Sequence, residues 1–489
     1  MKSLNKILQG VEVKQIIGNN YTLVNDLNQD SRLIKKNDMF FAIKGNLNDG
    51  HLFITSAIEK GASVIACETL PNDIQKNITY VVLENIRYEL AIIASNFFDK
   101  PSQKLKLVGV TGTNGKTTIA TLLYRLTMNM GIKAGLLSTV ENKIANKTIK
   151  ATLTTPDVIS INRLMSEMVV VGCEYAFMEV SSHSIDQDRI SDLDFDIAIF
   201  TNITHDHLDY HKTFLNYINV KKKFFDILKP EAFALTNIDD NNGEVMVQNS
   251  ISKIRSYSLR QMADFKGRIL QNSLLGLHLK INNNEAFFKL TGQFNAYNLL
   301  AVFGAAVLSG LAEDEVLIEM SRLNSVDGRF EIIQNSEKGI FAIIDYAHTP
   351  DALKNVLNTV KNSKNKGSKL IVVFGAGGNR DKTKRPEMGR IASRLSDTVI
   401  VTSDNPRDEN PEEIMKDILK GISSEDKEKV LEIEDREQAI KTALMLAKNG
   451  DVIVIAGKGH ETYQEIEGKR YHFSDKDIVN DIWQNNNNN

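Results

Sequence analysis

The stretch "LKLVGVTGTNGKTTIATLLYRLTMNMG" (residues 105–131) decides the fold of this chain. Its apolar run to Val110 is typical of a buried strand, and a glycine-rich turn follows at once. The periodic pattern after the turn predicts a helix that ends at Gly131. A strand, a tight turn and a helix in this order indicate a parallel α/β sheet.

The turn has the residues of a phosphate-binding loop. Glycines at 112 and 115 let backbone N–H groups approach phosphate oxygens, and the N-terminus of the helix favours negative charge. Lys116 can reach the terminal phosphates, and the Thr117 hydroxyl can ligate magnesium. The usual G-x-x-x-x-G-K-[ST] spacing would place a glycine at Val110, so a turn that only caps a helix is the alternative. The strand–turn–helix context favours a nucleotide, ATP rather than GTP.

Length and composition restrict the class of protein. At 489 residues, and roughly 150 residues per domain, about three domains are expected. A formal net charge of -3 provides no global basic field for nucleic acid or acidic membranes. Cys67 and Cys173 lie far apart without metal-ligand spacing, which predicts free buried thiols in a reducing compartment. The N-terminus lacks a signal-peptide core and no run approaches the ~20 apolar residues of a membrane helix, so we expect a soluble, cytoplasmic protein.

Strand and helix signals fall into three groups, which we place at residues 1–100, 101–332 and 333–489. Each group contains apolar runs of strand length separated by helical patterns. Strands that alternate with helices predict an α/β fold whose parallel sheets are covered on both faces. The terminal "QNNNNN" (484–489) is low in complexity and is predicted to fray.

Two polar clusters follow predicted strands of the middle group. Glu179 lies at the tip of "YAFMEVSS" (175–182), where a carboxylate can hold a cation, and "THDHLDYH" (204–211) gathers three histidines and two aspartates. Open α/β sheets bind ligands at this edge. Magnesium prefers oxygen ligands, so a site that includes a histidine needs phosphate oxygens and water to complete it. A zinc hydrolase is the competing hypothesis, but H-E-x-x-H or comparable ligand spacing does not occur.

The third group contains "DTVIVTSDNPRDENP" (397–411), in which Asp404, Asn405, Pro406 and Arg407 follow a predicted buried strand. Asp, Asn and Pro are ordinary turn residues, so a solvated turn is the simplest interpretation. The loops "GGNRDKTKRP" (377–386) and "GKGHETY" (457–463) follow two other strands. In a parallel sheet all three loops converge on one edge, which makes a binding site the alternative.

With these residues the chain resembles the Mur ligases, ATP-dependent enzymes that build the peptide of the bacterial peptidoglycan precursor. Four ordered motifs carry the resemblance over nearly the whole chain: "TGTNGKTT" (111–118), "TNITHDHLDYH" (201–211), "GQFNAYNLLAVFGAA" (292–306) and "DYAHTPDAL" (345–353). Further motifs point to the members that add the third amino acid: "QDSR" (29–32), "DGHLFI" (49–54), "TTPD" (154–157) and "EVSSHSIDQDR" (179–189). The family phosphate loop also explains why Val110 stands where a glycine is usual.

The resemblance implies three domains: a small N-terminal α/β domain for the uridine nucleotide, a central P-loop ATPase domain and a C-terminal Rossmann-like domain. It implies that UDP-N-acetylmuramoyl-L-alanyl-D-glutamate contacts Ser31, Arg32, His51, Thr154, Thr155, Ser181, Gln187 and Arg189. It assigns ATP to Gly112, Thr113, Asn114, Gly115, Lys116, Thr117, Thr118, Asn295, Asn298, Arg329, Asp345 and His348. Magnesium would be held by Thr117, Glu179 and His207, and by Lys221 if it is a carbamate. The simpler hypothesis for Lys221 is a solvated helix lysine, one of three in a row.

The implied reaction starts with phosphorylation of the D-glutamate carboxylate, after which an amine attacks the acyl phosphate, with Lys116, Lys221, Glu179 and His207 in catalytic roles. The amine is assigned to Arg380, Asp404, Asn405, Pro406, Arg407, Gly457 and Glu461. Members that add meso-diaminopimelate read Asp-Asn-Pro-Arg in this loop, as here, because the arginine matches the extra carboxylate. We expect small-molecule substrates only, no nucleic-acid or membrane partner, and a monomer.

Three alternatives remain at this point. The nearest is the lysine-adding ligase of the same type, against which only the Arg407 argument stands. A folylpolyglutamate synthetase shares the acyl-phosphate chemistry, but should lack the first hundred residues that carry "DSR" and "DGH". A regulatory P-loop protein that uses ATP as a switch would leave "DNPR" and "GKGHE" without a purpose.

Overall fold

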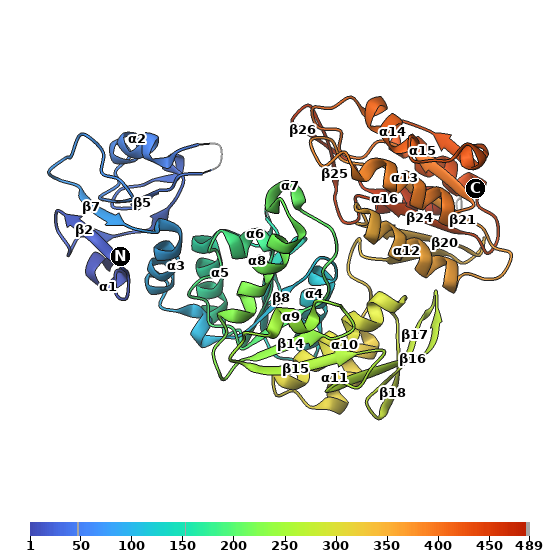
Figure 1. The fold of residues 1–489 in the computed structure, drawn as a ribbon, viewed down its shortest axis with the longest axis horizontal. Coiled ribbons are helices and arrows are strands. Elements are labelled where there is room, and N and C mark those ends of the chain that lie inside the picture. Colours follow the sequence, from blue (N-terminus) through green and yellow to red (C-terminus); the bar gives the residue numbers. More distant parts are fainter. Residues whose placement is uncertain (46–47, 152, 486–489) are drawn as a thin grey trace.

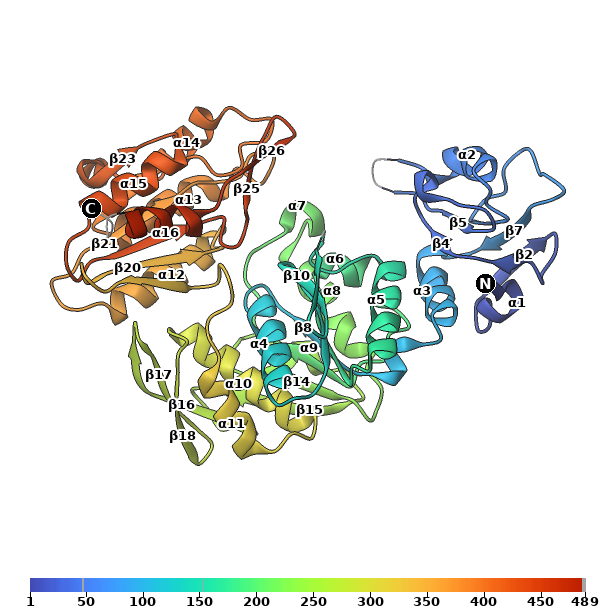
Figure 2. The same ribbon diagram turned by 180° about the vertical axis from the view of Figure 1, so that it is seen from behind.

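A computed structural model describes residues 1–45, 48–151 and 153–485. The chain forms three domains in sequence order, each built on its own main sheet (Figure 1). The N-terminal and C-terminal domains lie at opposite ends of the middle domain, as the reverse view in Figure 2 also shows. The predicted α/β class with three domains is therefore confirmed.

The N-terminal domain has a five-stranded sheet in the order β2-β7-β6-β5-β4. Strands β4 to β7 run parallel, and β2 pairs antiparallel with β7 at one edge. Apolar residues of α1 and α3 cover one face and those of α2 cover the other. The elements are β1 (Lys2–Ser3), α1 (Leu4–Ile7), β2 (Val13–Ile17), β3 (Leu23–Val24), β4 (Leu27–Asn28), β5 (Met39–Ala42), α2 (Ile54–Glu59), β6 (Val64–Cys67), β7 (Thr79–Leu83) and α3 (Ile86–Phe97).

The middle domain has an eleven-stranded sheet in the order β11-β10-β9-β12-β8-β13-β14-β15-β16-β17-β18. The run from β9 to β16 is parallel, and both ends of the sheet are antiparallel hairpins. The strands are β8 (Lys106–Thr111), β9 (Ala134–Leu137), β10 (Glu141–Ile144), β11 (Lys147–Lys150), β12 (Tyr175–Glu179), β13 (Ile197–Phe200), β14 (Phe233–Asn237), β15 (Lys253–Ser258), β16 (Phe265–Ser273), β17 (Gly276–Ile281) and β18 (Asn284–Phe288).

Helices cover both faces of this sheet, which is why β8 reads as a continuous apolar run. Residues of α4, α10 and α11 form the core on one face, and residues of α5, α8 and α9 form the core on the other. The helices are α4 (Lys116–Asn129), α5 (Val158–Val171), α6 (Ser182–Asp186), α7 (Leu208–His211), α8 (Phe214–Asp226), α9 (Gly243–Val247), α10 (Gln293–Leu308) and α11 (Glu313–Arg322). The predicted helix after the glycine-rich turn is confirmed, and Gly131 follows its last turn in the left-handed conformation.

The C-terminal domain has a six-stranded sheet in the order β19-β20-β24-β21-β22-β23, parallel except for β19. Strands β24, β21 and β22 are neighbours, so the three loops that follow them meet at one edge, as predicted. The elements are β19 (Glu331–Asn335), β20 (Ile340–Asp345), α12 (Pro350–Ser363), β21 (Leu370–Phe374), α13 (Lys384–Leu395), β22 (Thr398–Val401), α14 (Pro411–Leu419), β23 (Val430–Glu432), α15 (Arg436–Leu446), β24 (Val452–Ala456), β25 (Tyr463–Ile466), β26 (Lys469–His472) and α16 (Asp475–Asn485).

Other predictions concern single features. Cys67 and Cys173 are free and buried, as expected. Among the described residues, no helix has the length and apolar character needed to cross a membrane. The predicted fraying of the asparagine tail falls mainly on residues 486–489, which lie outside the described residues.

Candidate active site

The phosphate loop lies between β8 and α4, and one of its glycines is required by the space around it. Gly115 caps the N-terminus of α4 with a φ of +92°, and a Cβ there would lie 2.6 Å from Asn298 Oδ1. Val110, which replaces the usual first glycine, is fully buried inside β8. The turn therefore begins after the strand, at Gly112, and a valine at position 110 is compatible with it.

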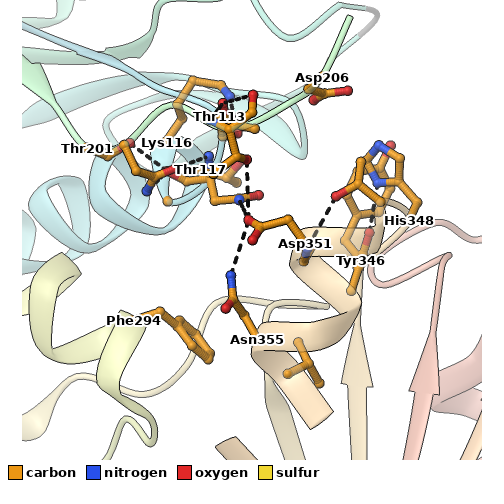
Figure 3. Close-up of a pocket in the computed structure, with 18 of the residues that line it drawn as sticks. Thr113, Lys116, Thr117, Thr201, Asp206, Phe294, Tyr346, His348, Asp351 and Asn355 are labelled. Carbon is orange, nitrogen blue, oxygen red and sulfur yellow. Dashed lines mark hydrogen bonds between the residues drawn. The ribbon is translucent and has the colours of Figure 1, made fainter. Parts of the chain in front are cut away.

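Neighbouring loops hold the phosphate loop in shape. The Thr113 N–H donates to Asn202 O at 2.8 Å, and the Thr201 hydroxyl donates to Asn114 O at 2.6 Å. The Lys116 ammonium donates to Gly112 O at 2.8 Å and to Thr113 O at 2.9 Å, so it lies across the loop (Figure 3). Burial lowers the pKa of Lys116, and the nearby Glu179 partly opposes this shift. A ligand phosphate offers stronger, charged acceptors for this ammonium.

Glu179 lies at the end of β12, beside the phosphate loop. Its carboxylate accepts a hydrogen bond from the Thr117 hydroxyl at 2.8 Å and one from Thr139 N at 2.7 Å. His207, in a left-handed conformation with φ +54°, places Nε2 3.4 Å from Asp206 Oδ2. Partial burial in the cavity lowers the pKa of His207 to about 4, although Asp206 opposes the shift.

These groups fit a magnesium ion better than a zinc ion. Within residues 1–45, 48–151 and 153–485, no group of three His, Cys, Asp or Glu side chains is arranged to hold a metal by itself. The hydroxyl of Thr117 and the carboxylate of Glu179 are hard oxygen donors, which suit magnesium. A magnesium ion there would take its remaining ligands from phosphate and water, so the zinc hydrolase alternative finds no support.

Lys221 of α8 is not a solvated lysine, although its two neighbours are also lysines. Its side chain is 1% exposed, and its Nζ donates to Gly112 O at 2.9 Å. Burial, with the neighbouring Lys116 ammonium, holds the pKa of Lys221 well below its usual value. Lys222 is also largely buried, but its ammonium pairs with Asp226 at 2.7 Å along the same helix. The simpler hypothesis for Lys221 is therefore wrong.

Residues predicted to contact ATP from the second side come from α10, from the segment just before β19 and from the C-terminal domain. Asn298 donates to Asn295 Oδ1 at 3.0 Å, and both are buried in α10. Arg329 donates to the Thr117 hydroxyl at 3.2 Å and lies 4.5 Å from the centre of the Tyr346 ring. Arg329 thus joins the phosphate loop to the beginning of the C-terminal domain.

Asp345 and His348 belong to "DYAHTPDAL" at the end of β20. The Asp345 carboxylate accepts the N–H groups of Phe330 and Ala347, both at 2.7 Å, and burial raises its pKa. His348 Nδ1 lies 2.9 Å from Tyr346 O (Figure 3). The Asp345 carboxylate therefore fixes the turn that presents His348 to the cavity.

Asp351, in the first turn of α12, was not singled out from the sequence. Its Oδ2 accepts hydrogen bonds from Asn114 Nδ2 at 3.2 Å and from the Thr204 hydroxyl at 3.3 Å, both in the middle domain. It also accepts one from Asn355 of its own helix at 3.3 Å (Figure 3). Asp351 therefore connects the C-terminal domain directly to the phosphate loop.

The loop after β22 is buried and ordered by hydrogen bonds, so it is not a solvated turn. Asp404 and Asn405 are 6% and 5% exposed, and Asn405 Nδ2 donates to Glu461 Oε2 at 2.8 Å. Arg407 has a φ of +53°, and its Nη1 donates to Gly378 O at 2.7 Å. Three strand-end loops therefore meet here, as the parallel sheet predicted.

A single cavity of about 1570 Å³ joins these groups, running from the phosphate loop to the loop after β22. The predicted residues that line it are Thr113, Asn114, Gly115, Lys116, Thr117, Thr118, Thr154, Thr155, Glu179, Ser181, Arg189, His207, Lys221, Asn295, Asn298, Arg329, Asp345, His348, Arg380, Asp404, Asn405, Arg407, Gly457 and Glu461. Three predicted residues of the middle and C-terminal domains do not line the cavity. Gly112 and Pro406 are next to lining residues in the chain, and Gln187 accepts a hydrogen bond from Arg189, which lines it.

Ser31, Arg32 and His51 are in the N-terminal domain and do not line this cavity. Arg32 pairs with Asp30 at 2.7 Å and is 84% exposed, and the His51 ring contacts Asp49 at 2.8 Å. The N-terminal domain is held to the middle domain through α5, whose Arg163 pairs with Asp26 at 2.9 Å. A ligand that contacts these residues and the cavity has to extend between the two domains.

The fold and the site define a three-domain P-loop enzyme whose nucleotide cavity continues into a separate α/β domain. Models of the family match three segments: "Mur ligase family, catalytic domain" at residues 24–101, "Mur ligase middle domain" at 110–306 and "Mur ligase, glutamate ligase domain" at 328–459. The chain belongs to the Mur ligase family.

Relatives and solved structures match over the full length. The UDP-N-acetylmuramoyl-L-alanyl-D-glutamate--2,6-diaminopimelate ligase of Phocaeicola vulgatus is 52% identical, over 99% of each chain. The ligase of the same name from Parabacteroides distasonis is 53% identical, over 98% of this chain and 99% of its own. A solved structure of such a ligase has a TM-score of 0.71 and 32% identity, and covers 100% of both chains.

Proposed function

We propose that this enzyme joins meso-diaminopimelate to the D-glutamate carboxylate of UDP-N-acetylmuramoyl-L-alanyl-D-glutamate, with conversion of ATP to ADP and phosphate. One observation carries the proposal: Arg407 and the Asp404–Asn405 pair line the same cavity as Lys116 of the phosphate loop. An amino acid whose far end is bound near Arg407 can therefore extend its reacting amine toward a carboxylate that is activated near Lys116. Relatives that are 52% and 53% identical carry this activity in their names.

Each domain receives one task in this proposal. Residues 1–100 bind the uridine end of the substrate through Ser31, Arg32 and His51, residues 101–332 bind ATP, and residues 333–489 bind the amino acid. The sugar–peptide part lies along Thr154, Thr155, Ser181, Gln187 and Arg189. In support, Arg189 donates to Thr155 O at 2.9 Å and to Gln187 Oε1 at 2.6 Å, which makes one connected polar wall. We also propose that the enzyme is a cytoplasmic monomer.

The first step transfers the γ-phosphoryl group from ATP to a carboxylate oxygen of D-glutamate. The bond between this phosphorus and the ADP oxygen breaks, and a P–O bond to the carboxylate forms. Lys116 and the loop N–H groups stabilise the charge that moves, which is mainly positioning and electrostatics. Arg329 and His348 contact the nucleotide from the C-terminal side, and Asn295 and Asn298 support the loop from α10.

Magnesium would be held by the Thr117 hydroxyl, Glu179 and His207, together with phosphate oxygens. When bound, it neutralises the phosphate charge and polarises the γ-phosphoryl group. The uncharged amine of Lys221 can add to carbon dioxide, with loss of a proton, to form a carbamate. The low pKa of Lys221 supports this, because only the neutral amine is a nucleophile. A carbamate would change this buried cation into an oxygen ligand.

The second step is attack of the diaminopimelate amine on the acyl phosphate. A C–N bond forms, phosphate leaves with the C–O electron pair, and the amine loses a proton. Arg407 receives the far carboxylate and Asp404 with Asn405 receives the far ammonium, whereas Arg380, Gly457 and Glu461 complete the pocket. L-lysine lacks that carboxylate and leaves Arg407 without a partner, which disfavours it.

The test is phosphate release from ATP in the presence of the UDP-muramoyl dipeptide, with meso-diaminopimelate or L-lysine as the amine. We expect release that depends on both the dipeptide and diaminopimelate. Equal release with lysine would retain the ligase and reject the choice of amine. Phosphate release at the same rate with or without the dipeptide and the amine would overturn the proposal in favour of an ATP-driven switch.

A further inference from the structure

A fully buried lysine lies behind the proposed amine pocket. Lys458 follows β24 in the "GKGHE" loop and is 0% exposed. Its Nζ donates to Asn405 Oδ1 at 3.0 Å and lies 3.5 Å from Glu461 Oε2 and 3.6 Å from Asp404 Oδ1. One ammonium therefore contacts both side chains assigned to the far ammonium, Asp404 and Asn405, and also Glu461.

The charges in this cluster depend on that ammonium. Asp404 and Glu461 are two largely buried carboxylates, and burial together with Asp404 raises the pKa of Glu461, whereas Lys458 lowers it. Two neighbouring buried carboxylates repel each other and are desolvated, so a cation within contact distance of both stabilises the pair. Arg436 and Lys384 also interact with Asp404 at longer range, but Arg436 is paired with Asp475 at 2.8 Å. Among the described residues, Lys458 is the cation that lies within 4 Å of both carboxylates.

Lys458 also fixes the orientation of Asn405. The Asn405 Oδ1 accepts from Lys458 and from the Glu465 N–H at 2.9 Å. Its Nδ2 is thereby directed to Glu461, to which it donates at 2.8 Å. With two donors on one side, the reversed amide would place an N–H group against an ammonium.

One carboxylate oxygen of the cluster lacks a hydrogen bond. Asp404 Oδ1 is buried and lies 3.6 Å from Lys458 Nζ, but it accepts no hydrogen bond from the residues that the structure describes. Asp404 lines the cavity, and a Cβ on Gly457 would lie 2.8 Å from its other carboxylate oxygen, so the backbone closes around that side. A buried carboxylate oxygen without a donor is suited to an incoming ammonium.

We propose that Lys458 is a positioning residue that determines specificity: its ammonium lies against the Asp404 and Glu461 carboxylates and orients Asn405, so that the pocket recognises the far ammonium of diaminopimelate. This inference rests on the proposed function. The remaining charge of the cluster is negative, two carboxylates against one ammonium, whereas Arg407 and Arg380 line the cavity as cations. The charges of the pocket are therefore complementary to a zwitterionic group, in which an ammonium lies beside a carboxylate.

The experiment compares meso-diaminopimelate with L-2-aminopimelate, which retains the reacting amine and the far carboxylate but lacks the far ammonium. We measure kcat/KM for both amines in the native enzyme, in Lys458→Met and in Lys469→Met. Lys469 is an exposed lysine at the start of β26 and serves as the matched control. Values of KM for ATP and for the UDP-muramoyl dipeptide, with the Tm of each variant, report on folding and on the other sites.

We expect the native enzyme to prefer diaminopimelate by about 100-fold, as for loss of a buried charged hydrogen-bond partner. In Lys458→Met this preference should fall at least about tenfold, with the KM for ATP and for the dipeptide within about twofold. Lys469→Met should retain the native preference. An equal loss with both amines, or an unchanged preference, would overturn the inference, because a merely structural lysine would not change the ratio.

If Lys458→Met does not fold, Lys458→Gln carries the same expectation, since it keeps a donor for Asn405 and loses only the charge. Lys458→Arg should retain more of the preference than Lys458→Gln, and the reverse order would also overturn the inference. Failure of the proposed function gives a different result. In that case the native enzyme shows no phosphate release that depends on either amine.

Discussion

Replacement of Arg407 by alanine removes the group that we assign to the far carboxylate of diaminopimelate. The backbone of Arg407 is held independently of its side chain, since its N–H donates to Glu465 O at 3.0 Å and its carbonyl accepts the Glu467 N–H at 2.8 Å. Both arginine and alanine meet the same restriction at a φ of +53°. We therefore expect the Arg407→Ala variant to fold with the loop after β22 unchanged.

The size of the effect follows from the donors that are available. Of the five N–H donors of this guanidinium, the described contacts use one, from Nη1 to Gly378 O at 2.7 Å. A carboxylate can accept two of the others as a bidentate pair. A hydrogen bond to a charged group contributes ~1.5–3 kcal/mol, so loss of the pair, partly offset by water, costs roughly 3 kcal/mol. This corresponds to a fall of about 100-fold in kcat/KM for diaminopimelate.

The assay is initial phosphate release at saturating ATP and UDP-muramoyl dipeptide, with diaminopimelate or L-lysine varied. Lysine has no far carboxylate, so its kcat/KM should not fall in Arg407→Ala, and the preference for diaminopimelate should collapse. Arg470→Ala is the matched control, because Arg470 is 59% exposed, lies 4.3 Å over the Tyr463 ring and does not line the cavity. A loss below about threefold with diaminopimelate, or an equal loss with lysine, would refute the reasoning.

Three further predictions concern the nucleotide side of the cavity. In enzyme kept free of carbon dioxide, Lys221 is an unmodified lysine whose pKa is lowered on folding, so its burial destabilises the protein most at low pH, and this cost disappears as the pH rises through the unfolded value of about 10.4. The Tm of Lys221→Met minus that of the native enzyme should therefore be larger at pH 6 than at pH 10. A constant difference would contradict the shift. Asp351→Ala removes two hydrogen bonds between domains and should raise the KM for ATP about tenfold. Asn355→Ala loses only the bond within α12, so its KM for ATP should stay within about twofold of the native value. Equal effects of the two variants would count against a link between the domains. Glu179→Gln keeps the shape of the side chain and removes its charge, so kcat should fall on the order of 100-fold and more magnesium should be needed for half-maximal rate. An unchanged magnesium requirement would reject Glu179 as a ligand.

The sequence was sufficient for features that depend on local chemistry. The phosphate loop was predictable because Gly115, Lys116 and Thr117 each have a distinct task between a strand and a helix. The parallel sheet of the C-terminal domain was predictable because its strands are buried on both faces and therefore read as continuous apolar runs.

Other features depend on contacts that are distant in the sequence. Asp351 resembles an ordinary acidic residue in a first helical turn, and only the placement of α12 brings it to Asn114, 237 residues away. Lys458 belongs to the sequence "GKGHE", but its complete burial depends on how Asn405 and Glu461 pack around it. The burial of Lys221 was undecided for the same reason, since three lysines in a row do not show which of them faces the sheet.

The central claim is that an acyl phosphate of D-glutamate is formed and then captured by diaminopimelate. It is tested most directly with UDP-muramoyl dipeptide labelled with ¹⁸O in the D-glutamate side-chain carboxylate, incubated with ATP and equal amounts of diaminopimelate and lysine. Mass spectrometry of the phosphate and of the UDP-linked product reports both steps. The account predicts one ¹⁸O atom in each phosphate released and a product that carries diaminopimelate. Unlabelled phosphate, or a product that carries lysine, would contradict it.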